Sequence, residues 1–312
     1  MRYLHNSTKI LLFVLFYLNF SYFQVFAEST PPFRIATLKK HEFLYFRNSY
    51  YVVKPKDTLV QLAVKFRVGY RNLKIANHIK DPWILKTGKK LIIPYQIVLP
   101  KDFLALKKGN KRVIIVNLPE MRLYFFYSDK CFVAPIGIGI KGKLPPEGVY
   151  WILRKKENPT WYPPPSIKEK NPNLPKFLPP GPDNPLGKYA LYLSKGLYAI
   201  HGTNRIYSIG RRSTHGCIRL YPEDIKFLYE NVKIPTKVII LYEPIKIAIQ
   251  KDKVYIQAFP DIEKKLKNPL VWVIKKLKET SKRPLRINLI KLYEILKSPD
   301  GLVHEIGKVV TS

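Results

Sequence analysis

The sequence predicts a mainly β protein, with a β-sandwich-like central domain, a small βααβ module before it and a β/helical extension after it. Three observations predict this class. Residues 112–153 carry short β-branched and aromatic runs separated by turn signals, which is typical of a sandwich or barrel. Residues 50–95 fit a strand, two helices and a strand. Amphipathic helical spacing is found over 266–280 and 287–297, in the extension. A chain of 312 residues has room for two or three such domains.

The composition excludes disorder and indicates an anionic partner. Hydrophobic residues make up 46% and charged residues 25% of the chain, and 55 basic against 22 acidic residues give a net charge of +33. The excess is spread evenly, since residues 246–312 hold 15 basic and 7 acidic residues. A nucleic-acid reader concentrates its basic residues on one face. We therefore expect no nucleic acid but an acidic cell envelope as the partner.

Residues 1–27 are predicted to be a secretory signal peptide. Arg2 and Lys9 precede an apolar run over 10–20, and Val25-Phe26-Ala27 offers small residues at a cleavage site. An uncleaved membrane anchor is the alternative, although the run is shorter than a spanning helix requires. No second stretch is long and apolar enough to span a membrane. The mature protein is thus expected to be exported to the periplasm or cell envelope, with no transmembrane domain after cleavage.

Residues 28–49 are expected to be a polar linker, and 50–95 a small domain. Tyr51-Val52-Val53 indicates a strand, and Asp57-Thr58 is suited to cap a helix that runs to Phe66. A second helix follows Gly69, and 90–94 returns to a strand. The pattern resembles a LysM module through Tyr51-x-Val53, Asp57-Thr58-Leu59, Leu62-Ala63, Ala76-Asn77, Asp81-Pro82 and Leu91-x-Ile93-Pro94. Lys56 departs from it, because the family usually has glycine there.

The LysM resemblance implies binding of an N-acetylglucosamine-containing glycan such as peptidoglycan. The groove would involve Asp57, Thr58 and Leu59 together with Trp83 and Ile84 in the Pro82-Trp83-Ile84 stretch. A structural interpretation stays open, because helix capping and core packing require the same residue types.

The central domain is expected over 110–244. Strands are predicted at 112–117, 122–127, 132–140 and 238–242, and a helix at 222–231, which begins with proline and two acidic residues. Ten of the 27 prolines fall within 159–185, so this segment is neither a helix nor a central strand. It is predicted to be a lid or cleft wall with Trp161, Tyr162 and Asn184 available for contact, or else a surface spacer.

The extension over 245–312 is expected to hold a strand pair at 246–258 and amphipathic helices at 266–280 and 287–297. Their spacing is no more than core packing requires, and no chemistry is predicted there.

The two cysteines occupy different settings. A disulfide is the first expectation for an exported chain with two cysteines, but Cys131 lies in an apolar strand pattern, whereas Cys217 lies in the polar, glycine-flanked Ser213-Thr214-His215-Gly216-Cys217. We therefore expect one structural and one chemical cysteine.

His201, His215 and Cys217 are the candidate catalytic group. A thiol needs a base to become a nucleophilic thiolate, and an imidazole takes that proton. His215 lies two residues before Cys217, so a common strand would place both on one face, and an adjacent strand would bring His201 alongside. The backbone N–H groups of Gly216 and Cys217 would stabilise an oxyanion. Packed structural histidines and a zinc site remain alternatives.

The motif His201-Gly202-Thr203 … Ser213-Thr214-His215-Gly216-Cys217-Ile218-Arg219-Leu220 resembles the signature of L,D-transpeptidases of the ErfK/YkuD type. Residues 180–187 and 221–225 extend the likeness, which covers roughly 110–258. Thr214 departs from the usual serine but keeps a hydroxyl. The resemblance implies a β-rich YkuD-type domain without metal or organic cofactor.

By resemblance, Cys217 would be an ionised nucleophile that attacks a tetrapeptide stem of peptidoglycan and releases D-alanine. An amine of another stem, giving a 3→3 cross-link, or of an envelope protein would then resolve the thioester. His201 would be the general base, His215 would orient the site, and Arg219, Gly202, Thr203, Ser213 and Thr214 would contact substrate. The implied role is peptidoglycan biosynthesis, cell wall organisation and cell shape. A wall hydrolase (an L,D-carboxypeptidase) and a non-catalytic peptidoglycan-binding protein are the alternatives.

Overall fold

The computed structural model describes residues 33–99, 103–104 and 112–310. The predicted signal peptide over 1–27 lies outside these residues. In the part of the chain that is described, no helix is long and apolar enough to cross a membrane.

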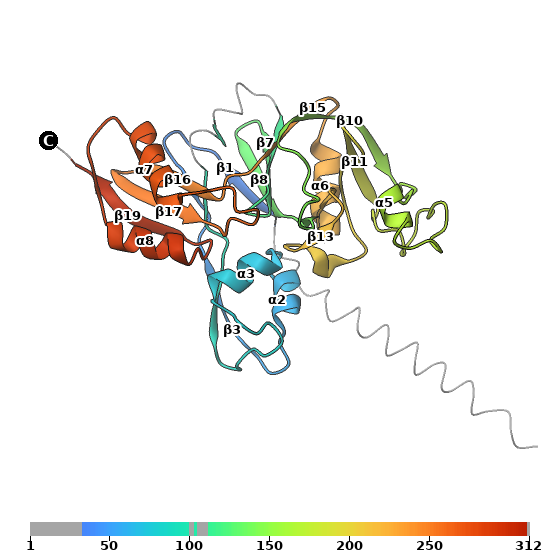
Figure 1. The fold of residues 1–312 in the computed structure, drawn as a ribbon, viewed down its shortest axis with the longest axis horizontal. Helices are drawn as coiled ribbons and strands as arrows, with labels where there is room; N and C mark the ends of the chain where they lie inside the picture. The colour runs from blue at the N-terminus through green and yellow to red at the C-terminus, as the bar shows by residue number, and fades with distance from the viewer. Residues whose placement is uncertain (1–32, 100–102, 105–111, 311–312) are drawn as a thin grey trace, which may run out of the picture. The chain divides into compact units, whose positions relative to one another are not determined.

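A nine-stranded sheet dominates the described residues, in the order β1-β8-β7-β6-β15-β10-β11-β12-β14 (Figure 1). Neighbouring strands are antiparallel except for the parallel pairs β15–β6 and β12–β14. The strands are β1 (Arg34–Thr37), β6 (Val113–Asn117), β7 (Arg122–Tyr127), β8 (Lys130–Pro135), β10 (Gly148–Glu157), β11 (Tyr189–Leu193), β12 (Ala199–His201), β14 (Ile218–Arg219) and β15 (Thr236–Leu241).

Both faces of this sheet are covered, which explains the unbroken apolar runs in its sequence. Ile114 and Val116 of β6 pack into one buried cluster, together with α6 (Pro222–Asn231). Val113 and Ile115, which alternate with them, pack into a second cluster on the opposite face. A strand buried on both sides needs no polar alternation, and the mainly β, sandwich-like prediction is confirmed.

The first strand lies inside the range predicted to be a linker. β1 pairs with β8, Ala36 opposite Cys131, so residues 34–37 form an edge of the main sheet. The sequence signal was weak because Ala36 is the one buried residue of the strand. Phe33 before the strand packs its ring on Phe132 and Phe227, with centroids 5.8 and 5.0 Å apart.

The small N-terminal domain follows the predicted βααβ order. β3 (Ser49–Val52) pairs with β4 (Lys90–Ile93), and α2 (Leu59–Lys65) and α3 (Tyr70–Ala76) lie between them in the chain. Leu59, Leu62, Leu73, Leu91 and Ile93 form its core. Outside this unit, β2 (Leu44–Tyr45) pairs with β5 (Ile97–Val98).

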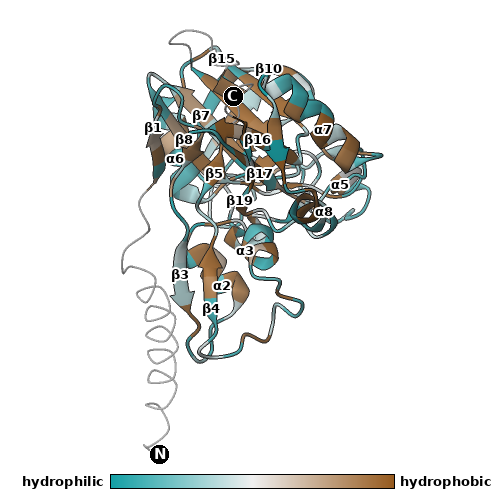
Figure 2. Cartoon of the chain, turned by 90° about the vertical axis from the view of Figure 1, so that its left-hand side faces the viewer, coloured by the Kyte–Doolittle hydropathy of each residue, from teal (hydrophilic) through white to brown (hydrophobic). Residues whose placement is uncertain are grey.

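The C-terminal extension is a second four-stranded sheet covered by two helices. Its order is β16-β17-β19-β18, with β16 (Ile245–Gln250), β17 (Lys253–Ala258), β18 (Leu285–Ile287) and β19 (Val303–Val309). The helices are α7 (Pro269–Thr280), capped by Asn268, and α8 (Leu289–Lys297), capped by Asn288. Each carries an apolar and a polar face, as Figure 2 shows. The strand pair and both helices were predicted, whereas β18 and β19 were not.

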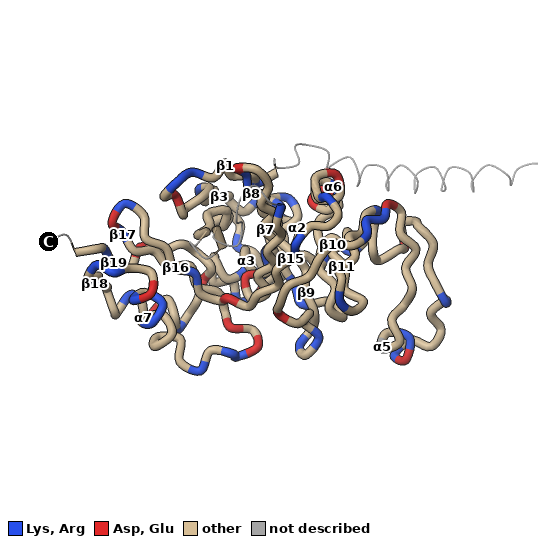
Figure 3. Tube along the Cα trace, turned by 90° about the horizontal axis from the view of Figure 1, so that it is seen from above, with Lys and Arg blue, Asp and Glu red and all other residues tan. Residues whose placement is uncertain are grey.

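Positive charge is distributed over the whole described chain. Figure 3 shows Lys and Arg on the main sheet, the helices and the extension alike, with fewer acidic positions between them. This agrees with the even spread in the sequence.

Candidate active site

The predicted motif folds onto one edge of the main sheet. β12 and β14 are parallel neighbours, with Ile200 opposite Ile218 and His201 opposite Arg219. Cys217 immediately precedes β14, so it lies one strand away from His201 and two positions before Arg219. Because side chains alternate along a strand, His201, Arg219 and Cys217 belong to the same face. The adjacent-strand placement predicted for His201 is confirmed.

Cys217 is a partly exposed cysteine that is not in a disulfide, and Cys131 is buried in β8. The Cys217 thiol donates a hydrogen bond to the Leu197 carbonyl at 3.7 Å. Burial raises the pKa of this thiol, and the backbone N–H of Ala199 and the Arg219 cation oppose the rise only in part. Burial thus favours the protonated thiol in this unliganded structure, whereas the sequence analysis expects an ionised one.

His201 is buried, and its Nδ1 lies 2.6 Å from the Gly202 carbonyl oxygen. Burial and the nearby Arg219 lower the pKa of His201 to about 4. The imidazole is thus neutral over the physiological range. Hydrogen bonds from the ring to the backbone carbonyls of Gly202 and Leu186 oppose this lowering only in part.

His215 and Cys217 do not share a strand. β13 (Arg212–Thr214) ends before His215 and pairs with β9 (Ile138–Gly139), and the chain bends at Gly216 before β14. The same-face prediction for His215 is therefore wrong. Its exposed ring lies near Lys170 and Lys143, which add to burial in lowering its pKa.

Thr214 closes the turn around Cys217 rather than facing solvent. Its side chain is buried, its Oγ1 donates to the Cys217 carbonyl at 2.7 Å, and it accepts from the Gly216 N–H at 3.1 Å. In this state the Gly216 N–H already has a partner, so an oxyanion role for it requires that Thr214 release it.

Gly216 is required by its surroundings as well as by its backbone. Its φ is +120°, and a Cβ at this position would meet the Tyr198 ring at 2.6 Å. We expect Gly216→Ala to displace the turn and to lower kcat/KM by at least about tenfold. Gly142→Ala, where φ is +73° and no atom lies within 4 Å, is the matched control. Steady-state kinetics of the two variants check this, and equal activities would contradict it.

Two polar atoms at the site are buried without a partner. Within the described residues, Arg219 Nε and Ser213 Oγ have no hydrogen-bond partner. An unpaired buried donor is costly, so both are suited to receive a ligand. Arg205 also lies close enough to lower the pKa of Arg219. Arg205, Lys143 and Lys170 were missed by the sequence analysis, because they come from separate loops with no shared motif.

Gly202 and Thr203 have packing roles in this structure. Thr203 is buried and its Oγ1 accepts from the Arg205 N–H at 2.9 Å. A Cβ on Gly202 would lie 3.2 Å from Ile225 of α6. They shape the loop that leaves His201.

The proline-rich segment is tied together from inside. Asn184 is buried, and its amide donates to the carbonyls of Pro159, Leu178 and Pro179. The prediction that Asn184 is available for contact is therefore wrong. Tyr162 is exposed, and Lys170 from this segment reaches His215.

The five predicted glycan-binding residues separate into two groups. Thr58 caps α2 in a reciprocal pair with Gln61, Asp57 accepts from Tyr51 at 2.8 Å, and Leu59 is fully buried. These three have structural roles here. Trp83 and Ile84 are about three-quarters exposed, at 75% and 76%, and remain the candidates for contact with a glycan.

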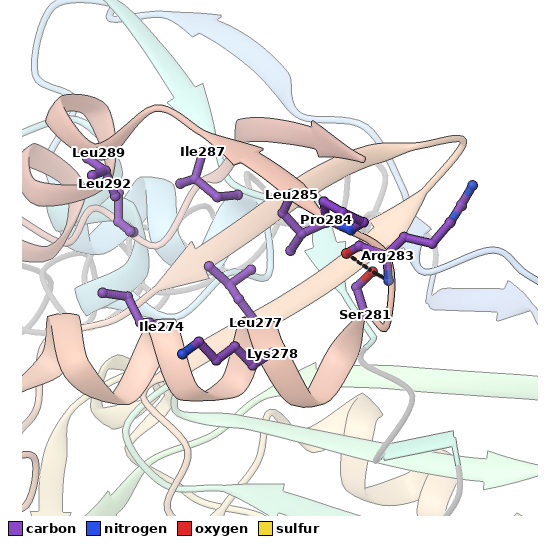
Figure 4. Close-up of a pocket in the computed structure, with 10 residues that line it drawn as sticks. All are labelled: Ile274, Leu277, Lys278, Ser281, Arg283, Pro284, Leu285, Ile287, Leu289 and Leu292. Atoms are coloured by element: carbon purple, nitrogen blue, oxygen red, sulfur yellow. Dashed lines mark hydrogen bonds between the residues drawn. The ribbon is translucent and has the colours of Figure 1, made fainter. Parts of the chain in front are cut away.

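A groove lies in the extension, away from these residues. It has a volume of about 460 Å³ and runs between α7, β18 and α8, as Figure 4 shows. Leucines and isoleucines line most of it, with Lys278, Ser281 and Arg283 among them. In the described ranges no three His, Cys, Asp or Glu side chains are grouped to hold a metal ion.

Comparison with known proteins identifies the class of protein to which this fold and this sheet edge belong. Residues 111–240 match the L,D-transpeptidase catalytic domain (YkuD), and residues 51–94 match the LysM domain. The chain is 30% identical over 196 residues to "Putative L,D-transpeptidase YkuD" of Bacillus subtilis, covering 61% of this chain and 97% of that protein. The chain belongs to the YkuD-type L,D-transpeptidase family, and its N-terminal module is a LysM domain.

Two longer relatives come from Escherichia coli. "Probable L,D-transpeptidase ErfK/SrfK" is 42% identical over 201 residues, 62% of each chain. "Probable L,D-transpeptidase YbiS" is 41% identical over 203 residues, 62% of this chain and 63% of that one. The match thus spans somewhat less than two thirds of these relatives. Among solved structures, an L,D-transpeptidase from Mycobacterium smegmatis is 17% identical, with a TM-score of 0.33 over 43% of this chain and 59% of that one.

Proposed function

We propose that this protein is an exported peptidoglycan L,D-transpeptidase with Cys217 as its nucleophile. The observation that carries the proposal is the unpaired Arg219 Nε and Ser213 Oγ on the segment that holds Cys217. A peptide stem carries carboxylates, which a guanidinium and a hydroxyl recognise by charge-assisted hydrogen bonds. Family membership supports the acyl-transfer chemistry.

The first step forms a thioester. The His201 imidazole takes the thiol proton while the sulfur of Cys217 attacks the carbonyl carbon of the third stem residue, typically meso-diaminopimelate. The C–N bond to the terminal D-alanine breaks, and the imidazolium returns the proton to the leaving amine. The backbone N–H of Cys217, and that of Gly216 once Thr214 releases it, would stabilise the oxyanion.

Substrate binding prepares this proton transfer. The positive charge of Arg219 contributes to the low pKa of His201. A substrate carboxylate on Arg219 neutralises that contribution, so the pKa of His201 moves back toward its ordinary value. Burial, the larger cause of the low pKa, is not removed by the carboxylate, so only the contribution of Arg219 is relieved.

The second step releases the product. An amine attacks the thioester carbon, the C–S bond breaks, and the Cys217 thiol recovers a proton. The amine belongs to another stem, giving a 3→3 cross-link, or to a lysine of an envelope protein. Binding of glycan through the LysM domain, with Trp83 and Ile84 exposed on it, would raise the local concentration of stems.

Product analysis with a disaccharide-tetrapeptide tests the proposal. We expect D-alanine release and a cross-linked dimer in equal amounts with the wild-type protein, and neither with Cys217→Ala. D-alanine with free tripeptide and no dimer would replace the transpeptidase with a carboxypeptidase. Absence of both from the wild-type protein, with binding to peptidoglycan retained, would leave a non-catalytic binding protein.

The raised thiol pKa and the lowered imidazole pKa together predict the pH dependence. Because burial disfavours the thiolate, alkylation of Cys217 by iodoacetamide in the unliganded protein should have a midpoint above that of a free cysteine derivative. No inflection is expected near pH 6.5, since His201 is already neutral above about pH 4. Rates at Cys217, followed by peptide mass spectrometry, check this. A midpoint below that of the free thiol would contradict it.

A further inference from the structure

The loop that joins the two halves of the active-site motif is held by the LysM domain. This loop runs from 204 to 211 and includes a short 3₁₀ turn, η1 (Ile206–Ser208). The backbone N–H of Tyr70 donates to the Ile209 carbonyl, and that of Arg71 to the Gly210 carbonyl, both at 3.2 Å. These are N–H groups of the first turn of α3, which have no partner inside the helix. The LysM helix thus completes its hydrogen bonding on the loop.

Two glycines make this contact possible. A Cβ on Gly210, whose φ is +76°, would lie 2.2 Å from the Tyr70 nitrogen and 2.5 Å from Gly69 Cα. A Cβ on Gly69 would lie 3.2 Å from Gly210 Cα. The Arg211 guanidinium stacks over the Tyr70 ring at 3.6 Å. The backbones touch, and neither position has room for a larger residue without displacement.

The opposite side of the loop contacts the segment that follows β8. Gly210 N–H donates to the Ile136 carbonyl at 3.0 Å, and Ile138 N–H, in β9, donates to the Arg211 carbonyl at 3.0 Å. The loop is therefore held between α3 and the segment over 136–138, and its position is fixed from both sides.

A second contact lies directly after the nucleophile segment. The Tyr221 hydroxyl lies 3.3 Å from the Ala63 carbonyl and 3.2 Å from the Val68 carbonyl of the LysM domain. Arg67 forms a buried ion pair with Asp224 of α6. Residues 212–220, which include Cys217, are thus bracketed by LysM contacts at 209–211 and at 221–224.

We propose that the LysM domain is a positioning element of the transpeptidase site, with Gly69, Tyr70 and Tyr221 as positioning residues. The pairing of β12 with β14 brings His201 and Cys217 together, and the module holds the chain on both sides of the segment over 212–220 that carries Cys217, in addition to any glycan that it binds. The catalytic consequence rests on the proposed function, whereas the placement of Cys217 does not.

A glycine wedge on the LysM side tests this without changing the YkuD domain. Gly69→Val pushes on Gly210, and Gly69 has φ of −66°, which valine accepts. We expect kcat to fall at least about tenfold with KM within about threefold, because the reacting groups and not the substrate contacts are displaced. The matched control is Gly88→Ala in the same domain, where φ is +83° and no atom lies within 4 Å. It should retain wild-type kcat.

A second readout needs no substrate. The pH midpoint of Cys217 alkylation should shift by more than about half a pH unit in Gly69→Val. The reason is that the contacts of the Cys217 thiol with Leu197, Ala199 and Arg219 change. Buried Cys131 should stay protected in every variant, which reports that the fold is intact. If the wild-type protein does not transfer an acyl group, the proposed function is contradicted. The comparison of alkylation midpoints between the wild-type protein and Gly69→Val still tests the positioning role.

A folded Gly69→Val protein with wild-type kcat and alkylation midpoint would overturn the proposal. If this variant does not fold, Tyr221→Phe removes the hydroxyl contacts to Ala63 and Val68 and keeps the ring. Its alkylation midpoint should shift in the same measurement, and an unchanged midpoint in this variant would overturn the proposal equally.

Discussion

Replacement of Cys217 by serine should lower kcat/KM with a tetrapeptide stem by at least about 10³-fold. A serine hydroxyl ionises far less readily than a thiol, and the imidazole of His201, with its pKa lowered to about 4, is too weak a base to compensate. The fold should be unchanged, because the Cys217 sulfur is partly exposed and in no disulfide. Assays of D-alanine release over a range of stem concentrations measure the loss in kcat/KM.

The matched control for this variant is Cys131→Ala. Cys131 is fully buried in β8, on the face opposite α6, so its loss should cost about 1 kcal/mol of stability and leave kcat unchanged. A Cys217→Ser protein that keeps more than a tenth of wild-type activity would exclude Cys217 as the nucleophile.

The second large effect is expected at Glu120, the centre of a buried charge cluster. Its Oε1 accepts from Arg122 Nη1 at 2.8 Å, Lys246 Nζ at 2.7 Å and Tyr124 at 2.5 Å, and its Oε2 accepts from Asn117 at 3.0 Å. Burial alone would raise the pKa of Glu120, but Lys246 and Arg122 hold it below its ordinary value. The cluster connects β7 of the main sheet to β16 of the extension.

Glu120→Gln removes the negative charge and leaves the two cations buried without it. Breaking a buried ion pair in this way costs about 3–5 kcal/mol, which chemical denaturation measures as a loss in the free energy of unfolding. Glu305→Gln provides the control, since its ion pair with Lys253 is exposed and is worth at most about 1 kcal/mol. Equal losses in the two variants would show that the buried cluster contributes little.

Local sequence patterns predicted the helices and strands that bury one face only. They also predicted the helices whose first residues are typical of a helix N-terminus. The helix predicted at 222–231 is found at those residues, because proline and two acidic residues mark its first turn. Thr58 caps α2 as expected. The strand β1 was not predicted, because only one of its four side chains is buried. The strand depends on pairing with β8, about 100 positions later.

The site was predicted as a set of residues but not as an arrangement. The sequence identified Cys217, His201 and Arg219, and the parallel pairing of β12 with β14 brings them together. It misplaced His215, because the left-handed backbone at Gly216 breaks the strand. It also treated Asn184 as a contact residue, although the amide binds three carbonyls of its own segment. Contacts between the LysM domain and the loop over 204–211 lie beyond any local pattern.

Mass spectrometry of the intact protein, quenched during turnover of a disaccharide-tetrapeptide, tests the central claim most directly. The account predicts a mass increase equal to the stem without its terminal D-alanine, mapped by peptide analysis to Cys217 and lost in Cys217→Ala. D-alanine release with the adduct on another residue, or with no covalent adduct at any time, would contradict it.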